Sequence, residues 1–286
     1  MKIIPLAFDS LGVRSMAMFI ETDVKILIDP GAALGPSRYG LPPHPLELKK
    51  LTELESEIGK FADKSDILTI SHYHYDHYTP SANFYNDKIL LIKHPTEKIN
   101  LSQKGRVKDF LQEIDGKTKR IESADGREFA FGKTKIKFTP PCFHGEAGSK
   151  LGYVLMCSIE YENEKLIHAS DVQGPQVTET KEWIIEENPN TLIISGFPTI
   201  FLGWRFSKTG LDESNKNLIE ILEKTRVEKI ILEHHLLRDK FYEKKILSVL
   251  EKAKELNKKI LTAAEFLGKK NEFLEARRKE LYATSS

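Results

Sequence analysis

The sequence "ISHYHYDHYTP" at residues 70–80 holds three histidines and one aspartate within six positions. These residues are His72, His74, Asp76 and His77, and they directly follow an apolar, strand-like run. On an extended segment residues i and i+2 lie on the same side, so His72 and His74 can share one cation. Once the chain turns, Asp76 and His77 can face a second cation. An isolated His-x-His would fit a solvated loop better, but this longer pattern after a strand favours a metal site.

Further residues that can bind a metal follow the ends of other strand-like segments. His144 precedes a Gly-rich turn, and Asp171 ends the segment "KLIHASD" with a carboxylate suited to bridge two cations. The segment "EKIILEHHLLRD" ends on His234 and His235, which leaves the last ligand open by one residue. Each histidine alone would be more typical of a hydrogen-bonded structural residue. Their joint order after the H-x-H-x-D-H segment favours a metal centre.

The composition narrows the class of protein. The chain has 286 residues, 40% of them hydrophobic and 30% charged, which is typical of a soluble globular protein. The net charge of +1 gives no overall attraction to nucleic acid or anionic lipid. Apolar runs stay well below the roughly 20 residues of a membrane span, and the N-terminus does not resemble a signal peptide. We therefore expect a cytoplasmic protein that does not bind membranes.

Strand-like and helix-like segments alternate along the chain, which predicts an α/β protein of layered sheets. No composition break marks a domain boundary, so we expect a single domain over residues 1–286. The apolar spacing predicts a C-terminal amphipathic helix at about 262–282. Its basic stretch "EARRKE" (275–280) is interpreted as a solvated helix face.

The metal-ligand motifs resemble those of the metallo-β-lactamase superfamily along nearly the whole chain. Asp29-Pro30-Gly31 is similar to the first motif and the H-x-H-x-D-H at 72–77 to the second. His144, Asp171 and His234 are similar to the third, fourth and last motifs. The stretches "PSRYGLPPH", "SDVQGP" and "EHHLLRD" further resemble an archaeal group of predicted metal-dependent hydrolases within this superfamily.

This resemblance implies an αββα four-layer sandwich with two metal ions at one edge, between the sheets. It implies that one ion is bound by His72, His74 and His144, and that Asp171 bridges the two ions. The other ion would be bound by Asp76, His77 and the last histidine. The superfamily places that histidine two residues after an apolar triplet, a spacing that favours His234. His235 then becomes a candidate for substrate contact or proton donation.

Such a centre predicts a metal-dependent hydrolase that attacks with a metal-activated hydroxide. Two divalent ions, which we expect to be Zn²⁺ with Mn²⁺ or Fe as alternatives, would lower the pKa of a bridging water to ~7. Asp76 would also be catalytic, orienting the hydroxide or accepting its proton. We expect Asp29 to support a ligating histidine. Arg205, in the aromatic segment "FPTIFLGWRF" (197–206), is a candidate for binding an anionic substrate group, although this segment could equally serve packing.

The substrate stays open among an ester, a lactone and a phosphodiester. Nucleases of the superfamily generally carry an extra domain or arm, and the segment between Asp171 and His234 is too short for a sizeable insertion. A small molecule or phosphodiester is therefore favoured over nucleic acid. Two alternatives are a di-iron redox protein, which would depend on a flavin-bearing partner domain, and a non-catalytic metal-binding module. Whether the chain forms a homo-oligomer is left open.

Overall fold

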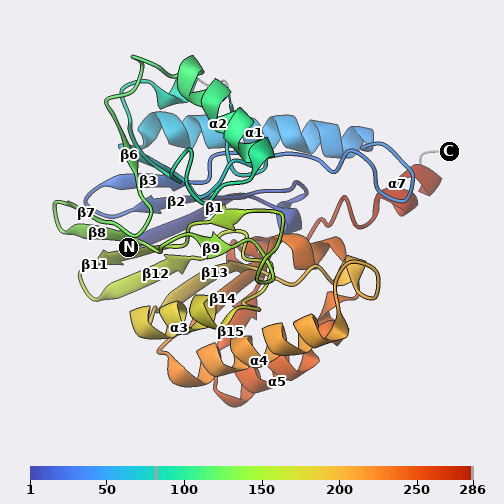
Figure 1. Cartoon of the computed structure of the whole chain (residues 1–286). Helices are drawn as coiled ribbons and strands as arrows, with labels where there is room; N and C mark the ends of the chain where they lie inside the picture. The colour runs from blue at the N-terminus through green and yellow to red at the C-terminus, as the bar shows by residue number, and fades with distance from the viewer. Residues whose placement is uncertain (81–82, 285–286) are drawn as a thin grey trace.

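Two β-sheets pack face to face, and helices cover the outer face of each sheet (Figure 1). This computed structural model describes residues 1–80 and 83–284. The first sheet has six strands in sequence order. They are β1 (Lys2–Phe8), β2 (Met16–Glu21), β3 (Lys25–Ile28), β4 (Ile67–Ile70), β5 (Ile89–Ile92) and β6 (Arg120–Ser123). The predicted αββα sandwich is confirmed.

The second sheet has seven strands in the order β15-β14-β13-β12-β11-β8-β7. Their bounds are β7 (Glu128–Phe131), β8 (Thr134–Phe138), β11 (Cys157–Tyr161), β12 (Glu164–His168), β13 (Thr191–Ser195), β14 (Lys229–Glu233) and β15 (Lys259–Leu261). A separate two-stranded sheet pairs β9 (Cys142–Phe143) with β10 (Tyr153–Val154).

Helices form the two outer layers. The first sheet is covered by α1 (Pro45–Lys64) and α2 (Leu101–Glu113). The second sheet is covered by α3 (Thr178–Glu187), α4 (Lys208–Lys224) and α5 (Leu247–Glu255). Two short helices, α6 (Ala263–Phe266) and α7 (Arg278–Thr284), lie in the C-terminal segment. Within the described ranges, no helix has the length and apolar character needed to span a membrane.

Three hydrophobic cores lie between the four layers. Alternate residues of a strand point to opposite faces of its sheet, and β2 shows this clearly. Met16, Met18 and Ile20 are buried between the two sheets, whereas Ala17 and Phe19 are buried on the helical side of the first sheet. Burying each such large apolar side chain contributes about 1.5–3 kcal/mol relative to leaving it exposed.

Strand direction brings the candidate ligands to one edge of the sandwich. Strands β3 to β6 run parallel to one another, as do β12 to β15. The chain leaves β4 at Ile70, β12 at His168 and β14 at Glu233, in each case just before predicted ligands. The carboxyl ends of parallel strands are where α/β proteins generally bind ligands.

The predicted C-terminal helix at about 262–282 is wrong. The chain leaves α6 at Gly268, which has a left-handed φ of 69°, and is irregular until α7 begins. The apolar spacing arises because two separate segments contact different cores: Phe266 packs against the core between the sheets, and Phe273 against the core beside α3 to α5.

The predicted solvated face of residues 275–280 is present only in part: Arg277, Lys279 and Glu280 are exposed. Glu275 and Arg278 are buried, with 9% and 0% of their surface exposed. Arg278 forms two hydrogen bonds with the Glu47 carboxylate, with its Nε 2.7 Å from one oxygen and its Nη2 2.8 Å from the other. The buried ion pair between Arg278 and Glu47 connects the C-terminal segment to α1.

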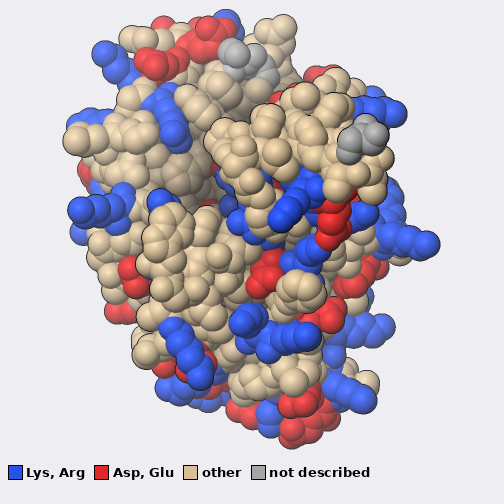
Figure 2. Space-filling view, turned by 90° about the vertical axis from the view of Figure 1, so that its right-hand side faces the viewer, with Lys and Arg blue, Asp and Glu red and all other residues tan. Residues whose placement is uncertain are grey.

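On the outer surface, Lys and Arg are interspersed with Asp and Glu over the face shown in Figure 2.

Candidate metal centre

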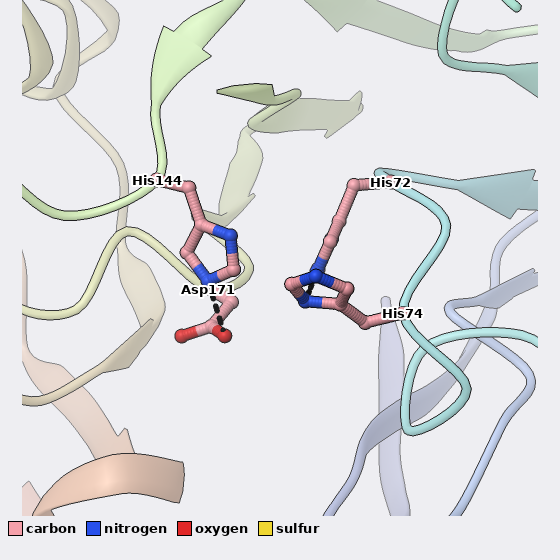
Figure 3. Close-up of side chains that lie close together, drawn as sticks. All are labelled: His72, His74, His144 and Asp171. Carbon is pink, nitrogen blue, oxygen red and sulfur yellow. Dashed lines mark hydrogen bonds and ion pairs between the residues drawn. The ribbon is translucent and has the colours of Figure 1, made fainter. Parts of the chain in front are cut away.

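The H-x-H-x-D-H segment forms a tight turn directly after β4. The backbone N–H groups of His77 and Tyr78 both donate to the carbonyl oxygen of His74, at 2.8 and 3.3 Å. The His72 and His74 side chains converge, with Nε2 of His72 3.1 Å from Nδ1 of His74 (Figure 3). Gly31 packs against this turn so closely that a Cβ atom there would lie 2.2 Å from the Tyr78 nitrogen. Only glycine fits at this position.

His144 and Asp171 complete a first group of ligand atoms with His72 and His74. Nε2 of His144 lies 2.7 Å from Oδ2 of Asp171, opposite the two other histidines (Figure 3). The ligand atoms of these four residues all lie within 4.8 Å of one another. The segment after β4, the segment after β9 and the segment after β12 therefore meet at one point, as the motif order predicted.

Asp76, His77 and His234 form a second group of three residues, whose ligand atoms also lie within 4.8 Å of one another. Asp171 lies between the two groups, because its Oδ2 is 3.6 Å from Nε2 of His234 and 4.0 Å from Nε2 of His77. The structure thus brings together all seven predicted ligands.

The two alternatives for the last ligand both lie beside Asp171. Nε2 of His235 is 3.1 Å from Oδ2 of Asp171, and His235 forms a third group with Asp171 and His234. Only His234, however, also groups with Asp76 and His77. Geometry therefore favours His234 as the ligand that shares an ion with Asp76, and His235 lies beside it.

Buried carboxylates hold the remaining ring nitrogens of two histidines. Asp29 Oδ2 lies 2.9 Å from Nδ1 of His77, and Asp9 Oδ2 lies 2.7 Å from Nδ1 of His234. Each contact leaves the Nε2 atom available to a cation and fixes the orientation of the ring. Asp29 thus contacts a candidate ligand histidine, as the sequence predicted. Sequence reasoning did not identify Asp9. Its position directly after the first strand was the only signal.

Arg238 is a second residue that the sequence reasoning missed. Its Nε donates to Asp9 Oδ1 at 2.9 Å, and its Nη1 lies 3.0 Å from Nδ1 of His235. Its Nη2 lies 3.2 Å from Nε2 of His234 and 3.9 Å from Oδ2 of Asp76. A buried guanidinium therefore lies beside the second ligand group, four residues after His234 on the same short helical segment (His234–Arg238).

Burial and neighbouring charges set the protonation of the centre. Burial lowers the pKa of His72, and burial and His144 lower that of His74 to about 4, so both rings are neutral at pH 7. Burial alone would raise the pKa of Asp76, but the charges of His77, His234 and Arg238 hold it below the usual range. Burial and Arg238 disfavour a charged His234, but the carboxylates of Asp9 and Asp171 outweigh them and raise its pKa to about 10.

The donors present fit divalent metal ions. Imidazole and carboxylate ligands suit zinc, manganese and iron. Among the described residues, the buried atoms His77 Nε2 and Asp171 Oδ1 have no hydrogen-bond partner, which is a costly arrangement unless a ligand binds them. Asp29, Ser170 and His234 have left-handed backbone conformations, with φ of 49°, 51° and 60°. Such strain in non-glycine residues concentrates at functional sites.

A cavity of about 490 Å³ opens over the ligand groups. Its floor includes His74, Asp76 and Asp171. Its walls come from distant segments, including Arg106 of α2 and the loop that carries Phe201 and Arg205. The two candidate substrate contacts, His235 and Arg205, both line it.

Comparison with known proteins gives clear relatives along the whole chain. The chain is 49% identical to a UPF0282 protein of Methanocaldococcus jannaschii, covering 98% of this chain and 96% of that protein. It is 46% identical to a UPF0282 protein of Korarchaeum cryptofilum, covering 99% of this chain and 94% of the relative. No family model matches the sequence.

Solved structures with the same fold are much more distant in sequence. The metallo-β-lactamase fold protein YhfI of Bacillus subtilis has a TM-score of 0.51 at 14% identity, covering 87% of this chain and 88% of its own. A metal-dependent hydrolase of the β-lactamase superfamily has a TM-score of 0.50 at 14% identity, covering 91% and 94%. The di-iron β-hydroxylase CmlA of Streptomyces venezuelae has a TM-score of 0.54 at 11% identity, covering 90% and 51%. These matches identify the metallo-β-lactamase fold.

Proposed function

The chain belongs to the UPF0282 protein family and has the metallo-β-lactamase fold, and from this premise we propose that it is a hydrolase with a two-ion centre. The observation that carries the proposal is the position of Asp171 between two groups of histidines. Its Oδ2 lies 2.7 Å from Nε2 of His144 in one group and 3.6 Å from Nε2 of His234 in the other. One carboxylate in that position is suited to bridge two cations.

In this proposal His72, His74 and His144 hold one ion, and Asp76, His77 and His234 hold the other. Two such ions, for which Zn²⁺ suits the donors best, would supply Lewis acidity and lower the pKa of a water molecule to about 7. Asp29 and Asp9 keep the rings of His77 and His234 in place through hydrogen bonds of 2.9 and 2.7 Å. The protein thereby presents its ligands in a fixed arrangement before the substrate arrives.

Asp76 would also transfer protons, in addition to binding metal, because it is partly exposed in the cavity, whereas His72 and His77 are fully buried. Its carboxylate can accept the proton of the attacking water and pass it toward the leaving group. No serine or cysteine nucleophile is needed. The bond cleaved belongs to an ester, a lactone or a phosphodiester. The interspersed charges on the face in Figure 2 support a small substrate over nucleic acid.

Metal analysis is the first test. We expect purified protein to hold about two ions per chain, and His74→Ala and Asp76→Ala to lose metal. His94→Ala is the matched control, because His94 lies after β5, outside the ligand groups, and its ring accepts hydrogen bonds from the nearby Thr96 and Glu97 backbone. Wild-type protein that binds no metal under native purification would contradict the proposal.

A hydrolysis screen is the second test. We expect the metal-loaded protein to cleave at least one of a chromogenic phosphodiester, lactone or thioester, and Asp76→Ala to abolish this activity. Iron content with a visible absorption band, and no hydrolysis, would favour the redox alternative. Metal binding with neither activity would favour a non-catalytic module.

A further inference from the structure

The guanidinium groups around the cavity differ in how they are neutralised. Arg14, Arg106, Arg205 and Arg238 all line it. Arg14 forms two hydrogen bonds of 2.6 Å with the buried Glu275 carboxylate, and Arg238 donates to Asp9 at 2.9 Å. These two charges are balanced by the protein itself and need no ligand.

Arg106 and Arg205 have no carboxylate within 4.0 Å among the described residues. Each is instead held over an aromatic ring, which favours a cation without neutralising it. The Arg205 guanidinium lies 4.4 Å from the centre of the Trp204 ring, and that of Arg106 lies 4.6 Å from the centre of the Tyr75 ring. Arg106 also donates one hydrogen bond to the Tyr73 carbonyl, whereas the Arg205 side chain makes none within the described part of the chain. Arg205 therefore offers an unused set of donors at the rim.

The loop that carries Arg205 is ordered by its own backbone. The N–H groups of Arg205 and Phe206 both donate to the Phe201 carbonyl, at 3.0 and 3.2 Å. The Gly203 N–H donates to the Phe206 carbonyl at 2.9 Å, and Gly203 adopts a left-handed φ of 82° that closes the turn. The loop backbone is therefore ordered and places the exposed Arg205 side chain at the cavity, so binding a ligand need not order the loop itself.

Exposed apolar side chains line the same cavity as Arg205 or lie next to it in the chain. Trp204 is 72% exposed, Tyr75 48% and Leu151 39%, and Tyr75 and Leu151 line the cavity together with Phe206. Large apolar groups that remain exposed at a concave site are typical of ligand contacts. The acidic residues of the lining, Asp76 and Asp171, are both committed to the ligand groups. The open part of the cavity therefore offers positive charge and apolar surface.

Building on the proposed function, we infer that the substrate is a small organic anion. An apolar or aromatic body packs against Tyr75, Leu151 and Phe206, and a negatively charged carboxylate or phosphate group binds Arg205. The planar fork of a guanidinium matches the two oxygens of such a group. A volume of about 490 Å³ fits a molecule of this size. Arg205 is thus a specificity residue at the rim, separate from the groups that act on the scissile bond.

A binding experiment tests the inference without relying on turnover. The chain has two tryptophans, so Trp183→Phe leaves Trp204 as the sole fluorescent reporter beside Arg205. In this background we would titrate phenylphosphonate, a stable anion, and benzyl alcohol, a neutral molecule with a similar body, with and without Zn²⁺. We expect Arg205→Ala to raise the Kd of phenylphosphonate about tenfold and to leave that of benzyl alcohol unchanged. Arg205→Lys should give an intermediate value.

Arg120→Ala is the matched control, because Arg120 begins β6 at the opposite end of the sheet, where its side chain forms an exposed ion pair with Glu122 and lies over the Phe131 ring. It should bind both probes like the parent protein. Equal affinity of the Arg205→Ala variant and the parent for phenylphosphonate would overturn the inference.

A kinetic experiment separates this inference from the proposed function. The probes are mono(4-nitrophenyl) succinate and 4-nitrophenyl butyrate, which have acyl chains of similar length and differ by one carboxylate. We expect Arg205→Ala to raise KM for the succinate about tenfold with little change in kcat, and to leave the butyrate unaffected. If neither ester is cleaved but phenylphosphonate binding depends on Arg205, the result contradicts hydrolysis of these esters and supports the anion site at Arg205. Ester cleavage with equal effects on both probes leaves the hydrolase intact and refutes the anion site.

Discussion

Two histidines of the candidate metal centre share a local design at the level of single residues. His77 and His234 each have a buried carboxylate on Nδ1, from Asp29 and Asp9, while Nε2 belongs to the ligand groups. Asp29 has further partners, because the N–H and the hydroxyl of Ser71 donate to it at 2.8 and 2.7 Å. Such carboxylates fix the imidazole tautomer and increase its basicity as a ligand.

Replacing the Asp9 carboxylate should weaken metal binding without removing a ligand. We expect Asp9→Asn to lower the affinity for the second ion by about 10- to 100-fold, because the His234 ring loses its charged partner. Competition with a chromogenic chelator measures the effect. Asp63→Asn is the control, since Asp63 is an exposed residue near the end of α1. Equal affinities of the Asp9→Asn variant and the wild type would show that this contact does not support the metal.

Sequence reasoning found the residues that belong to a linear pattern and missed those that do not. The ligands from His72 to His77 form one compact segment, and His144, Asp171 and His234 each follow a strand in the expected order. Asp9 lies 225 positions from His234 and belongs to no motif, so only the fold brings the two together. The same holds for Arg238, whose contacts with Asp9 and Asp76 depend on the packing of three segments.

At the level of elements, strands were predictable and the C-terminal segment was not. Apolar runs such as residues 66–71 and 191–196 correspond closely to β4 and β13, because a strand buried on both faces is apolar throughout. In the tail, the apolar residues repeat as in a helix, yet long-range contacts with two different cores override the local preference.

The buried pair between Arg278 and Glu47 should be important for stability. Both side chains are fully buried, so removing the cation leaves the Glu47 carboxylate of α1 buried without a charged partner. We expect Arg278→Met to lower the free energy of unfolding by about 3–5 kcal/mol, measured in urea. Arg277→Met is the matched neighbour, because Arg277 is 45% exposed and should change stability little.

A second substitution separates charge from packing at this contact. Glu47→Gln in the Arg278→Met background removes the unpaired charge and keeps an oxygen for the His44 N–H, which now donates to Glu47 at 2.8 Å. The double variant should therefore recover part of the lost stability. Equal stability of the wild type and the Arg278→Met variant would refute the structural role of the pair.

At the level of the whole molecule, the candidate centre joins the two sheets. His72 to His77 follow the first sheet, whereas Asp171 and His234 follow strands of the second. Ions bound there would contact both layers only in the folded state. Metal binding should therefore stabilise the whole sandwich, because a ligand that binds only the folded state shifts the equilibrium toward it.

Removing the metal should accordingly lower the melting temperature. With free Zn²⁺ at 100 times its Kd, one ion contributes about 2.7 kcal/mol. For a chain of 286 residues that corresponds to a rise of about 4–5 °C in melting temperature for each bound ion, measured by scanning calorimetry on the chelated and the loaded protein. The His74→Ala variant should show a much smaller shift. An equal shift in that variant would mean that Zn²⁺ stabilises the protein at another site.

The pairing of Arg14 with Glu275 has a consequence for synthesis on the ribosome. The two residues are 261 positions apart, and Arg14 lines the cavity. A nascent chain exposes the H-x-H-x-D-H segment long before His234 and Glu275 have been made. The growing polypeptide therefore carries only part of the candidate ligand set until His234 has left the exit tunnel, and the Arg14–Glu275 pair forms only after the tail has followed.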